Sequence, residues 1–313
     1  MLALIDGQDI YPGHEVYKEI EEEIDIIYID GKTLRDKDLK ESLKDVKYIL
    51  NGGRRLDRDM LKSLPKLEYI GMLATGYNSV DLDAAKEAGL VVTNVPDYST
   101  AAVSQFAVAM ILNALTSIDF YNKESSKGSW TKGPDFYKDH PIIEANGKTL
   151  GVLGFGNIGQ KVAGAMEALG MDIIFYDKKE TGDKRQRGLE EVLKTSDVLT
   201  LHLPLNDETH HILNKDTFDL MKEGVIIVNT ARGGLIKEED LIEALNSGRV
   251  YKASLDVLEK EPFDPDNPLL TMDRVRVSPH VSWASKEARS SLLEIAYENL
   301  KAYLSGNIQN RVG

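Results

Sequence analysis

The chain has 313 residues, of which 42% are hydrophobic and 28% are charged, so it is long enough for two domains and apolar enough to bury substantial cores. This composition excludes a disordered or fibrous protein. The formal net charge of −13 argues against nucleic acid and anionic membrane surfaces as partners, and the absence of cysteine excludes disulfides, cysteine-ligated metals and thiol nucleophiles.

The N-terminal segment MLALIDGQDI lacks the basic flank and the long apolar stretch of a signal peptide. Nowhere does the sequence contain about 18 consecutive apolar residues, the minimum for a membrane-spanning helix. We therefore expect a cytoplasmic protein without a membrane partner.

Short β-rich runs alternate with charged, helix-like stretches in residues 1–99. This alternation predicts βαβ units and a parallel sheet, which binds ligands beyond the carboxyl ends of its strands. The predicted strands are residues 2–6, 24–30, 48–52, 67–76 and 90–96.

The segment from Thr100 to about residue 120 is almost free of charge, and its apolar residues surround the predicted helix instead of forming one stripe. A helix of this kind is buried between domains or between subunits. A loop rich in Gly, Trp, Tyr and Pro follows at about 128–141.

A second α/β series begins at Lys148 and contains six predicted strands, the number expected for a dinucleotide-binding sheet. These strands are residues 149–156, 173–177, 197–204, 225–231, 251–257 and 275–280. A last amphipathic helix follows Trp283, and its predicted apolar face consists of Leu292, Ile295, Ala296, Leu300 and Leu304.

A glycine motif lies between the first strand of this series and the helix that follows it. Its residues are Gly154, Phe155, Gly156, Asn157, Ile158 and Gly159. The pattern GxGxxG is weak evidence alone, but the strand before it and the helix after it favour a dinucleotide site. Gly154 permits a tight turn, Gly156 lets the backbone approach a pyrophosphate, and Gly159 lets the helix pack closely. The helix N-terminus then offers N–H groups to the phosphates.

Asp177 lies 23 residues after Gly154, at the end of the next predicted strand. A carboxylate there accepts hydrogen bonds from adenosine ribose hydroxyls and repels a 2′-phosphate, so it favours NAD over NADP. Lys178 and Lys179 partly offset this repulsion and leave some use of NADP open. S-adenosylmethionine also binds to glycine-rich turns, so a methyltransferase is an alternative on these residues alone.

Arg232, Glu261 and His280 each follow an apolar strand, so they can converge at one sheet edge. Arginine can hold a carboxylate or keto oxygen through its planar fork of donors. Histidine changes its charge near neutral pH, and a neighbouring glutamate orients it and favours its protonated form. With hydride chemistry supplied by nicotinamide, a substrate anchor and a proton donor are sufficient for catalysis.

These segments resemble the D-isomer-specific 2-hydroxyacid dehydrogenases, and the likeness covers almost the whole chain. The matching segments are TGYNSVDLDAAKEAGLVVTNVPDYST (75–100), GKTLGVLGFGNIGQ (147–160), DVLTLHLPLNDETHHIL (197–213), NTARGGLIKEEDLIEALNSG (229–248), SLDVLEKEP (254–262) and SPHVSWASKEAR (278–289). Several long matches in order are much more specific than the glycine motif.

The resemblance implies roles for individual residues. Arg232 is then the substrate-binding arginine, and Glu261 and His280 form the acid/base pair. Thr75 and Gly76 belong to a loop whose N–H groups hold the substrate carboxylate. For the cofactor, the resemblance implies that Asp256 lies near the nicotinamide carboxamide and that Thr230 and Ala231 line the wall around it.

The resemblance also implies the architecture: two doubly wound parallel-sheet domains of Rossmann-like type, with a homodimer formed through segment 100–120. Residues 1–99 and 284–313 would form a discontinuous, flavodoxin-like substrate domain. Residues 100–283 would form the NAD-binding Rossmann domain.

Within the family, segments 133–151 and 280–289 resemble glycerate dehydrogenases, also called hydroxypyruvate reductases. We therefore expect NADH-dependent reduction of a small 2-keto acid, hydroxypyruvate or glyoxylate, to the D-2-hydroxy acid. The alternatives are a phosphoglycerate or D-lactate dehydrogenase-like enzyme and, from another class, a non-catalytic NAD-sensing module similar to a corepressor.

Two further histidine motifs have other interpretations. His202 lies within a predicted strand, where we expect a hydrogen-bonded imidazole with no catalytic role. His210 and His211 have no acidic or third histidine partner at metal-ligand spacing in the sequence, so we expect no metal site.

Overall fold

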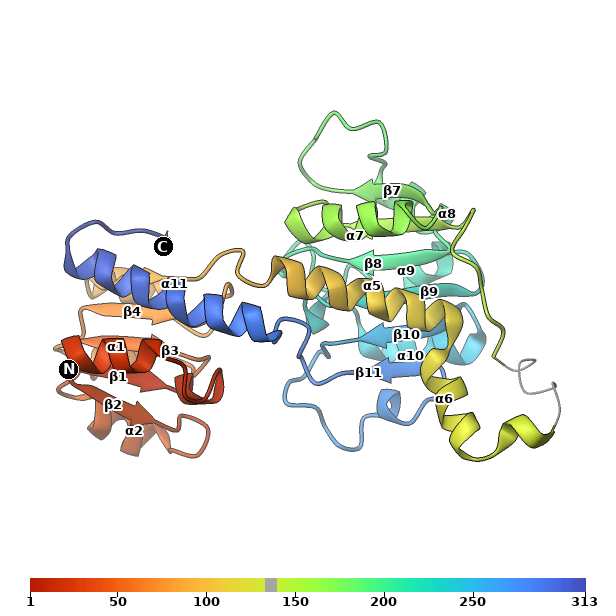
Figure 1. The fold of residues 1–313 in the computed structure, drawn as a ribbon. Coiled ribbons are helices and arrows are strands. Elements are labelled where there is room, and N and C mark those ends of the chain that lie inside the picture. The colour runs from red at the N-terminus through yellow and green to blue at the C-terminus, as the bar shows by residue number, and fades with distance from the viewer. Residues whose placement is uncertain (133–139) are drawn as a thin grey trace. The chain divides into compact units, whose positions relative to one another are not determined.

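The computed structural model describes residues 1–132 and 140–313 (Figure 1). The chain divides into two compact units. The first unit contains Met1–Ser99 and Ala284–Gly313, and the second contains Thr100–Trp283. Residues 133–139, which make up half of the predicted loop and begin the segment that resembles glycerate dehydrogenases, lie outside the described part of the chain.

The first unit contains a sheet with strand order β12-β5-β4-β3-β1-β2. Its strands are β1 (Leu2–Ile5), β2 (Ile26–Ile29), β3 (Tyr48–Asn51), β4 (Tyr69–Met72), β5 (Val91–Thr93) and β12 (Arg311–Val312). The first five are parallel, in the flavodoxin-like order 2-1-3-4-5, and β12 pairs antiparallel with β5.

Helices cover both faces of this sheet. The helices are α1 (Val16–Glu23), α2 (Asp36–Leu43), α3 (Arg58–Lys62), α4 (Leu82–Glu87) and α11 (Lys286–Leu304). Apolar residues of α2, α3 and α4 form one core with the strands, and α1 and α11 lie side by side (Figure 1). Side-chain caps fix several helix starts: Asp57 and Asp81 accept the backbone N–H groups of Met60 and Ala84.

The second unit contains a parallel sheet with strand order β11-β10-β9-β8-β6-β7. Its strands are β6 (Thr149–Leu153), β7 (Asp172–Tyr176), β8 (Val198–Leu201), β9 (Val225–Asn229), β10 (Val250–Leu255) and β11 (Val275–Val277). A parallel bridge between Phe175 and Gln186 extends the sheet beyond β7. Counted with this bridge as the third element, the order is the Rossmann order 3-2-1-4-5-6 with one more strand.

Helices enclose this sheet as well. They are α5 (Thr100–Thr116), α7 (Asn157–Glu167), α8 (Leu189–Thr195), α9 (Lys215–Leu220) and α10 (Glu238–Ser247). The helix α6 (Ile118–Ser126) follows α5 and has no buried residue. Residues of α5 and α7 form one apolar core with the strands, and residues of α8, α9 and α10 form another. The predicted fold of two doubly wound α/β sheets is confirmed.

Several predicted element boundaries are wrong. The strand predicted at 67–76 ends at Met72, before the polar turn. The helix predicted over 100–120 breaks at Ser117, whose φ is +56°. On the last helix, Leu292, Ala296 and Leu300 are buried, but Leu304 is 45% exposed. In the described residues no single helix is long and apolar enough to cross a membrane, and α5 and α6 pass that test only as a pair bent by 61°.

Candidate active site

The turn between β6 and α7 shows a distinct steric role for each of its glycines. Gly154 has a φ of +92°, and a Cβ there would lie 2.7 Å from the carbonyl carbon and oxygen of His202. A Cβ on Gly159 would lie 2.2 Å from the carbonyl oxygen of Gly154, so the helix packs directly on the turn. A Cβ on Gly156 would meet nothing within 4 Å. Space for a ligand therefore lies beside Gly156. The helix α7 begins at the next residue, Asn157, which is followed by Ile158.

Asp177 follows β7 and accepts hydrogen bonds from two backbone N–H groups. Its Oδ2 accepts the N–H of Phe155 at 2.8 Å, and its Oδ1 accepts that of Lys179 at 3.0 Å. The carboxylate therefore touches the glycine turn directly. The amine of Lys178 pairs with Glu208 at 2.5 Å, which engages one of the two cations next to Asp177.

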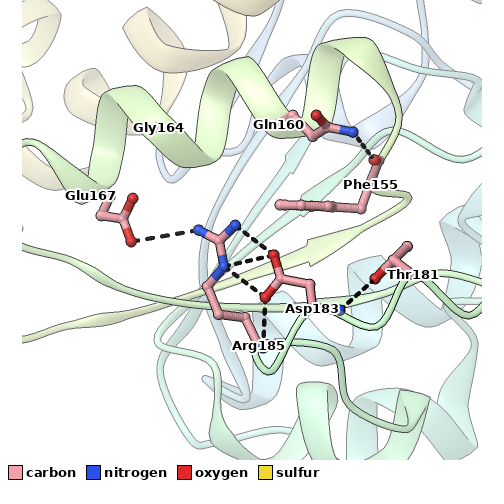
Figure 2. A pocket seen from close by; sticks show the side chains of 7 residues that line it. All are labelled: Phe155, Gln160, Gly164, Glu167, Thr181, Asp183 and Arg185. Carbon is pink, nitrogen blue, oxygen red and sulfur yellow. Dashed lines mark hydrogen bonds and ion pairs between the residues drawn. The ribbon is translucent and has the colours of Figure 1, made fainter.

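A pocket of about 420 Å³ adjoins the glycine turn (Figure 2). It is lined by Phe155, Gln160, Gly164, Glu167, Thr181, Asp183 and Arg185. The Phe155 ring stacks on Phe175 at a centroid distance of 3.7 Å, and the Arg185 guanidinium lies 5.4 Å from its centroid. The Gln160 amide donates to the Phe155 carbonyl at 2.8 Å. The Phe155 ring therefore contacts an aromatic ring and a guanidinium, while its carbonyl is bound by Gln160.

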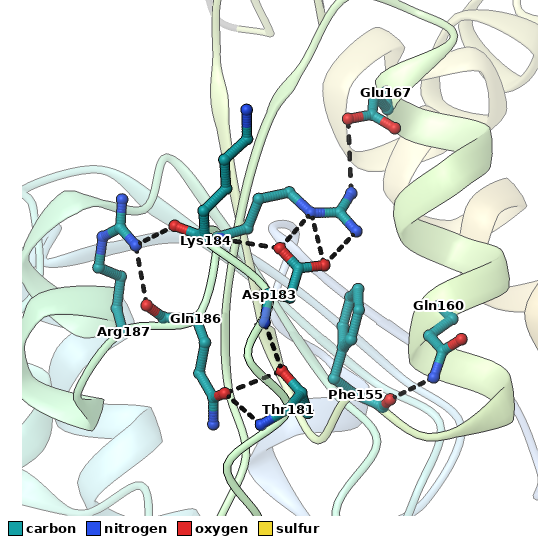
Figure 3. Close-up of polar contacts among 9 residues, drawn as sticks. Phe155, Gln160, Glu167, Thr181, Asp183, Lys184, Gln186 and Arg187 are labelled. Carbon is teal, nitrogen blue, oxygen red and sulfur yellow. Dashed lines mark hydrogen bonds and ion pairs between the residues drawn. The ribbon is translucent and has the colours of Figure 1, made fainter.

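The segment after Asp177 is fixed by side chains that Figure 3 draws together. Arg185 donates to Asp183 at 2.7 Å, and this guanidinium lowers the pKa of Asp183 to about 2. The Gln186 amide donates to the carbonyl oxygens of Asp177 and Lys179, at 3.1 and 3.0 Å. These contacts fix the backbone at Asp177.

His280 and Glu261 lie in direct contact. The imidazole Nδ1 is 2.7 Å from Glu261 Oε2, and the two side chains are 40% and 32% exposed. Glu261 Oε1 also accepts the backbone N–H of Leu258 at 3.2 Å. Among the described residues, Nε2 of His280 forms no hydrogen bond. The pair therefore presents one ring nitrogen for a proton transfer while the other is oriented by a carboxylate.

Asp256 lies beneath the segment that carries His280 and is fully buried. Its carboxylate accepts the Ser278 hydroxyl and the backbone N–H groups of Val281 and Ser282, the last two at 3.0 and 2.8 Å. His280 itself has a φ of +52°, and its N–H donates to the Asp256 carbonyl at 2.8 Å. The family resemblance implies a place for Asp256 near the nicotinamide carboxamide and does not predict this second role.

Arg232 lies in the turn after β9, just before the 3₁₀-helix Gly233–Leu235. It is exposed, and among the described residues no carboxylate pairs with it. The buried Asn229, which sequence reasoning missed, shapes the turn: its amide donates to the Arg232 carbonyl at 2.9 Å and its Oδ1 accepts the Ala231 N–H at 2.9 Å. A Cβ on Gly233 would lie 1.9 Å from the carbonyl oxygen of Leu258, so only glycine fits there.

The remaining predicted residues lie in two places. Thr230 is 6% exposed, and its hydroxyl has no hydrogen-bond partner within the described part of the chain. Thr75 and Gly76 lie in the first unit, in the turn after β4. The Thr75 hydroxyl donates to the Val95 carbonyl, and the Asn94 amide donates to the Thr75 carbonyl, both at 2.8 Å.

His202 is a hydrogen-bonded imidazole, as the sequence predicted. Its Nε2 lies 3.0 Å from the Thr200 hydroxyl. Burial lowers the pKa of His202 to about 4, so the ring is neutral at physiological pH.

The fold brings His210 and His211 close to an acidic residue that does not lie at metal-ligand spacing in the sequence. His211 Nε2 lies 2.7 Å from Glu259 Oε1, and the ligand atoms of His210, His211 and Glu259 all lie within 4.8 Å of one another. Glu259 is 48 residues from His211 in the sequence, so no local spacing could reveal the contact.

Lys252 is a buried cation in β10 that sequence reasoning missed. Its amine donates to the Ala114 carbonyl at 2.8 Å and to the Ser117 hydroxyl at 2.6 Å. Desolvation, with the charge of Arg276 nearby, lowers the pKa of Lys252 to about 8.

The sequence of the second unit matches a known domain. The model of the NAD-binding domain of D-isomer specific 2-hydroxyacid dehydrogenases matches residues 108–282, more than half of the chain. The chain belongs to the D-isomer specific 2-hydroxyacid dehydrogenase family. It is therefore an oxidoreductase that acts on a CH–OH group with a nicotinamide cofactor, and the predicted family and enzyme class are confirmed.

Relatives within this family extend the likeness to the whole chain. A hydroxypyruvate reductase of Blautia hydrogenotrophica is 40% identical over 99% of both chains. A glycerate dehydrogenase of Methylorubrum extorquens is 36% identical over 90% of both. The crystal structure of the TT0316 protein from Thermus thermophilus has a TM-score of 0.89 and 31% identity, with complete coverage of both chains.

Proposed function

We propose that this dehydrogenase reduces hydroxypyruvate or glyoxylate to the D-2-hydroxy acid with NADH. The observation that carries the proposal is the His280–Glu261 contact of 2.7 Å, in a chain of this family. The relatives named hydroxypyruvate reductase and glycerate dehydrogenase support the choice of substrate.

Arg232 binds the substrate in this proposal. Its guanidinium is exposed, its turn is fixed by Asn229, and its planar donors suit a carboxylate or keto oxygen. Thr75 and Gly76 supply backbone N–H groups for the substrate carboxylate, which makes the first unit the substrate domain. The substrate and the cofactor are anions, so these local donors act against the net charge of −13.

His280 is the acid/base residue in this proposal. The bound nicotinamide supplies the hydride. Protonated His280 donates its Nε2 proton to the carbonyl oxygen of the substrate as negative charge develops there. Glu261 holds Nδ1 and so fixes the orientation of the ring. In the reverse direction, neutral His280 accepts the hydroxyl proton.

The second unit is the NAD-binding domain, and its residues fit that cofactor. The open space beside Gly156 admits a pyrophosphate, and the eleven-residue helix α7 directs its first N–H groups there. Thr230, whose hydroxyl has no hydrogen-bond partner among the described residues, and Ala231 belong to the wall around the nicotinamide. Asp177 selects NAD over NADP, since Lys178 is already paired with Glu208.

Two further features belong to the proposal. The half-buried apolar residues of α5, which include Phe106, Met110 and Leu112, form part of a homodimer interface. The protein acts in the cytoplasm, with no nucleic acid or membrane partner.

Steady-state kinetics with hydroxypyruvate, glyoxylate, pyruvate and 3-phosphohydroxypyruvate, each with NADH and NADPH, test the proposal. We expect the highest kcat/KM with NADH and one of the first two acids. His280→Asn should lower kcat about 10²- to 10⁴-fold, the usual contribution of general acid–base catalysis. Arg232→Lys should lower kcat/KM at least about tenfold, because the planar fork is lost.

Other outcomes would overturn the proposal. NADH binding in calorimetry without oxidation by any of the four acids would favour a non-catalytic NAD-sensing module. A preference for 3-phosphohydroxypyruvate or pyruvate would point to a phosphoglycerate or D-lactate dehydrogenase instead.

A further inference from the structure

We infer that His210, His211 and Glu259 form a binding site for a divalent transition-metal ion of the Zn²⁺ type. Their candidate ligand atoms lie within 4.8 Å of one another. Zn²⁺ binds imidazole nitrogen and carboxylate oxygen at about 2.0–2.2 Å, so small side-chain rotations bring all of them onto one ion. Two imidazoles favour Zn²⁺, Ni²⁺ or Cu²⁺ over Mg²⁺ and Ca²⁺, which prefer oxygen ligands.

The closest contact in this His-His-Glu cluster is a hydrogen bond between two atoms that can both ligate an ion. His211 Nε2 and Glu259 Oε1 are 2.7 Å apart, and the centroids of the two imidazole rings are 3.8 Å apart. On binding, the ion replaces the hydrogen between His211 Nε2 and Glu259 Oε1, and that proton moves to Nδ1 of the ring or to solvent. Three protein ligands leave one position of a tetrahedral ion for water.

The backbone holds the cluster in place before an ion binds. His211 has a φ of +52°, and its N–H donates to the Gly234 carbonyl at 2.8 Å. Glu238 fixes Glu259 from two sides: its carboxylate accepts the Glu259 N–H, and its own N–H donates to Glu259 Oε2 at 3.4 Å. The carboxylate of Glu238 also adds a second negative charge beside the cluster, which favours a cation.

The location gives this ion a structural consequence. His210 and His211 lie in the loop after β8, and Glu259 lies in the loop after β10, two residues before Glu261. Between them is the turn of Arg232, whose neighbour Gly233 packs against Leu258. An ion on the cluster therefore links the loops after β8 and β10, which lie on either side of the turn that carries Arg232. Because the three ligands come together in the folded chain, the ion also stabilises the fold by mass action.

Calorimetric titration of the full-length, untagged protein with ZnSO₄ tests the site. We expect the wild type to bind one ion per chain. His210→Ala and Glu259→Gln should bind Zn²⁺ at least about tenfold more weakly, because loss of a group that only hydrogen-bonds to a metal ligand already lowers metal affinity about tenfold. The pair of His280 and Glu261 is another place where Zn²⁺ could bind. His280→Gln is therefore the matched control, and it should bind Zn²⁺ like the wild type.

A second measurement does not depend on catalysis. At the same concentration, Zn²⁺ should raise the Tm of the wild type and of His280→Gln more than the Tm of His210→Ala and Glu259→Gln. Both substituted side chains are exposed, so these variants should fold without the ion. Equal Zn²⁺ affinity in all four proteins, or a loss confined to His280→Gln, would overturn the inference. Neither readout uses turnover, so it stands or falls independently of the proposed function.

Discussion

The backbone carbonyl of Asp256 accepts a hydrogen bond from the N–H of His280 at 2.8 Å. The carboxylate of the same residue accepts the N–H groups of Val281 and Ser282, so Asp256 fixes the chain at and beyond the histidine. His280 adopts a φ of +52° there, a conformation that a non-glycine residue keeps only when its surroundings enforce it. Asp256 is therefore a positioning residue for the His280–Glu261 pair.

This relationship predicts the behaviour of Asp256→Asn. An amide nitrogen cannot accept a hydrogen bond, so one side of the carboxamide faces the N–H of Ser282 or Val281 without an acceptor. The free energy of unfolding should fall by about 1–3 kcal/mol, and kcat should fall while the KM for the keto acid changes little. Urea unfolding and steady-state kinetics measure the two effects. A lower stability with an unchanged kcat would show that Asp256 does not position His280.

The glycines of α7 offer a matched pair of substitutions. A methyl group on Gly159 meets the Gly154 carbonyl oxygen at 2.2 Å, whereas one on Gly164 meets nothing within 4 Å. Gly159→Ala should therefore lose about 1–3 kcal/mol or more and bind NADH weakly, because the helix must move away from the turn. Gly164→Ala should gain up to about 1 kcal/mol from its helix propensity. Thermal unfolding and NADH titration compare them, and equal effects would contradict the steric argument.

The third prediction concerns Asp177 and the preference for NADH over NADPH. Asp177→Asn keeps an oxygen for the Phe155 N–H but removes the charge that repels a 2′-phosphate. The ratio of kcat/KM with NADPH to that with NADH should rise about tenfold or more, the size of a hydrogen bond to a charged group. An unchanged ratio would mean that other residues select the cofactor.

The features that the sequence predicted well are encoded locally. The strands are short apolar runs between polar turns, and the glycine turn is marked by three glycines at a fixed spacing, so both could be predicted without the fold. His280 and Glu261 lie 19 residues apart, but Glu261 follows one predicted parallel strand and His280 ends the next, and the carboxyl ends of such strands meet at one edge.

The features that the sequence missed depend on distant partners. Ser117 follows α5 in a left-handed conformation. Its hydroxyl accepts a hydrogen bond from the amine of Lys252, which is 135 residues later in the sequence. Glu259 reaches His211 across 48 residues. The antiparallel strand β12 is two residues long, too short for any alternation to appear. These contacts are set by tertiary packing, which a local pattern does not contain.

Lys252 provides a prediction about stability and pH. Its pKa is about 8 in the folded chain, below the ordinary value of 10.5. Between these values the unfolded chain binds more protons than the folded chain, so the contribution of Lys252 to stability rises as the pH rises from about 8 to about 10.5. Lys252→Met removes this dependence. The unfolding free energy of the wild type should therefore rise relative to that of the variant by about 1–2 kcal/mol over this range. This value is already reduced to account for solvent screening.

Lys252→Arg is the control for this pH dependence, because its guanidinium stays charged throughout the range. The wild type should gain stability relative to both variants as the pH rises, and the two variants should differ from each other by a constant amount. That constant difference in unfolding free energy includes the contribution of hydrogen bonds to Ala114 and Ser117, which methionine cannot form. Urea unfolding at a series of pH values measures all three proteins. A difference between wild type and Lys252→Met that stays flat from about pH 8 to about 10.5 would show that the amine is charged in the folded chain throughout, despite its burial.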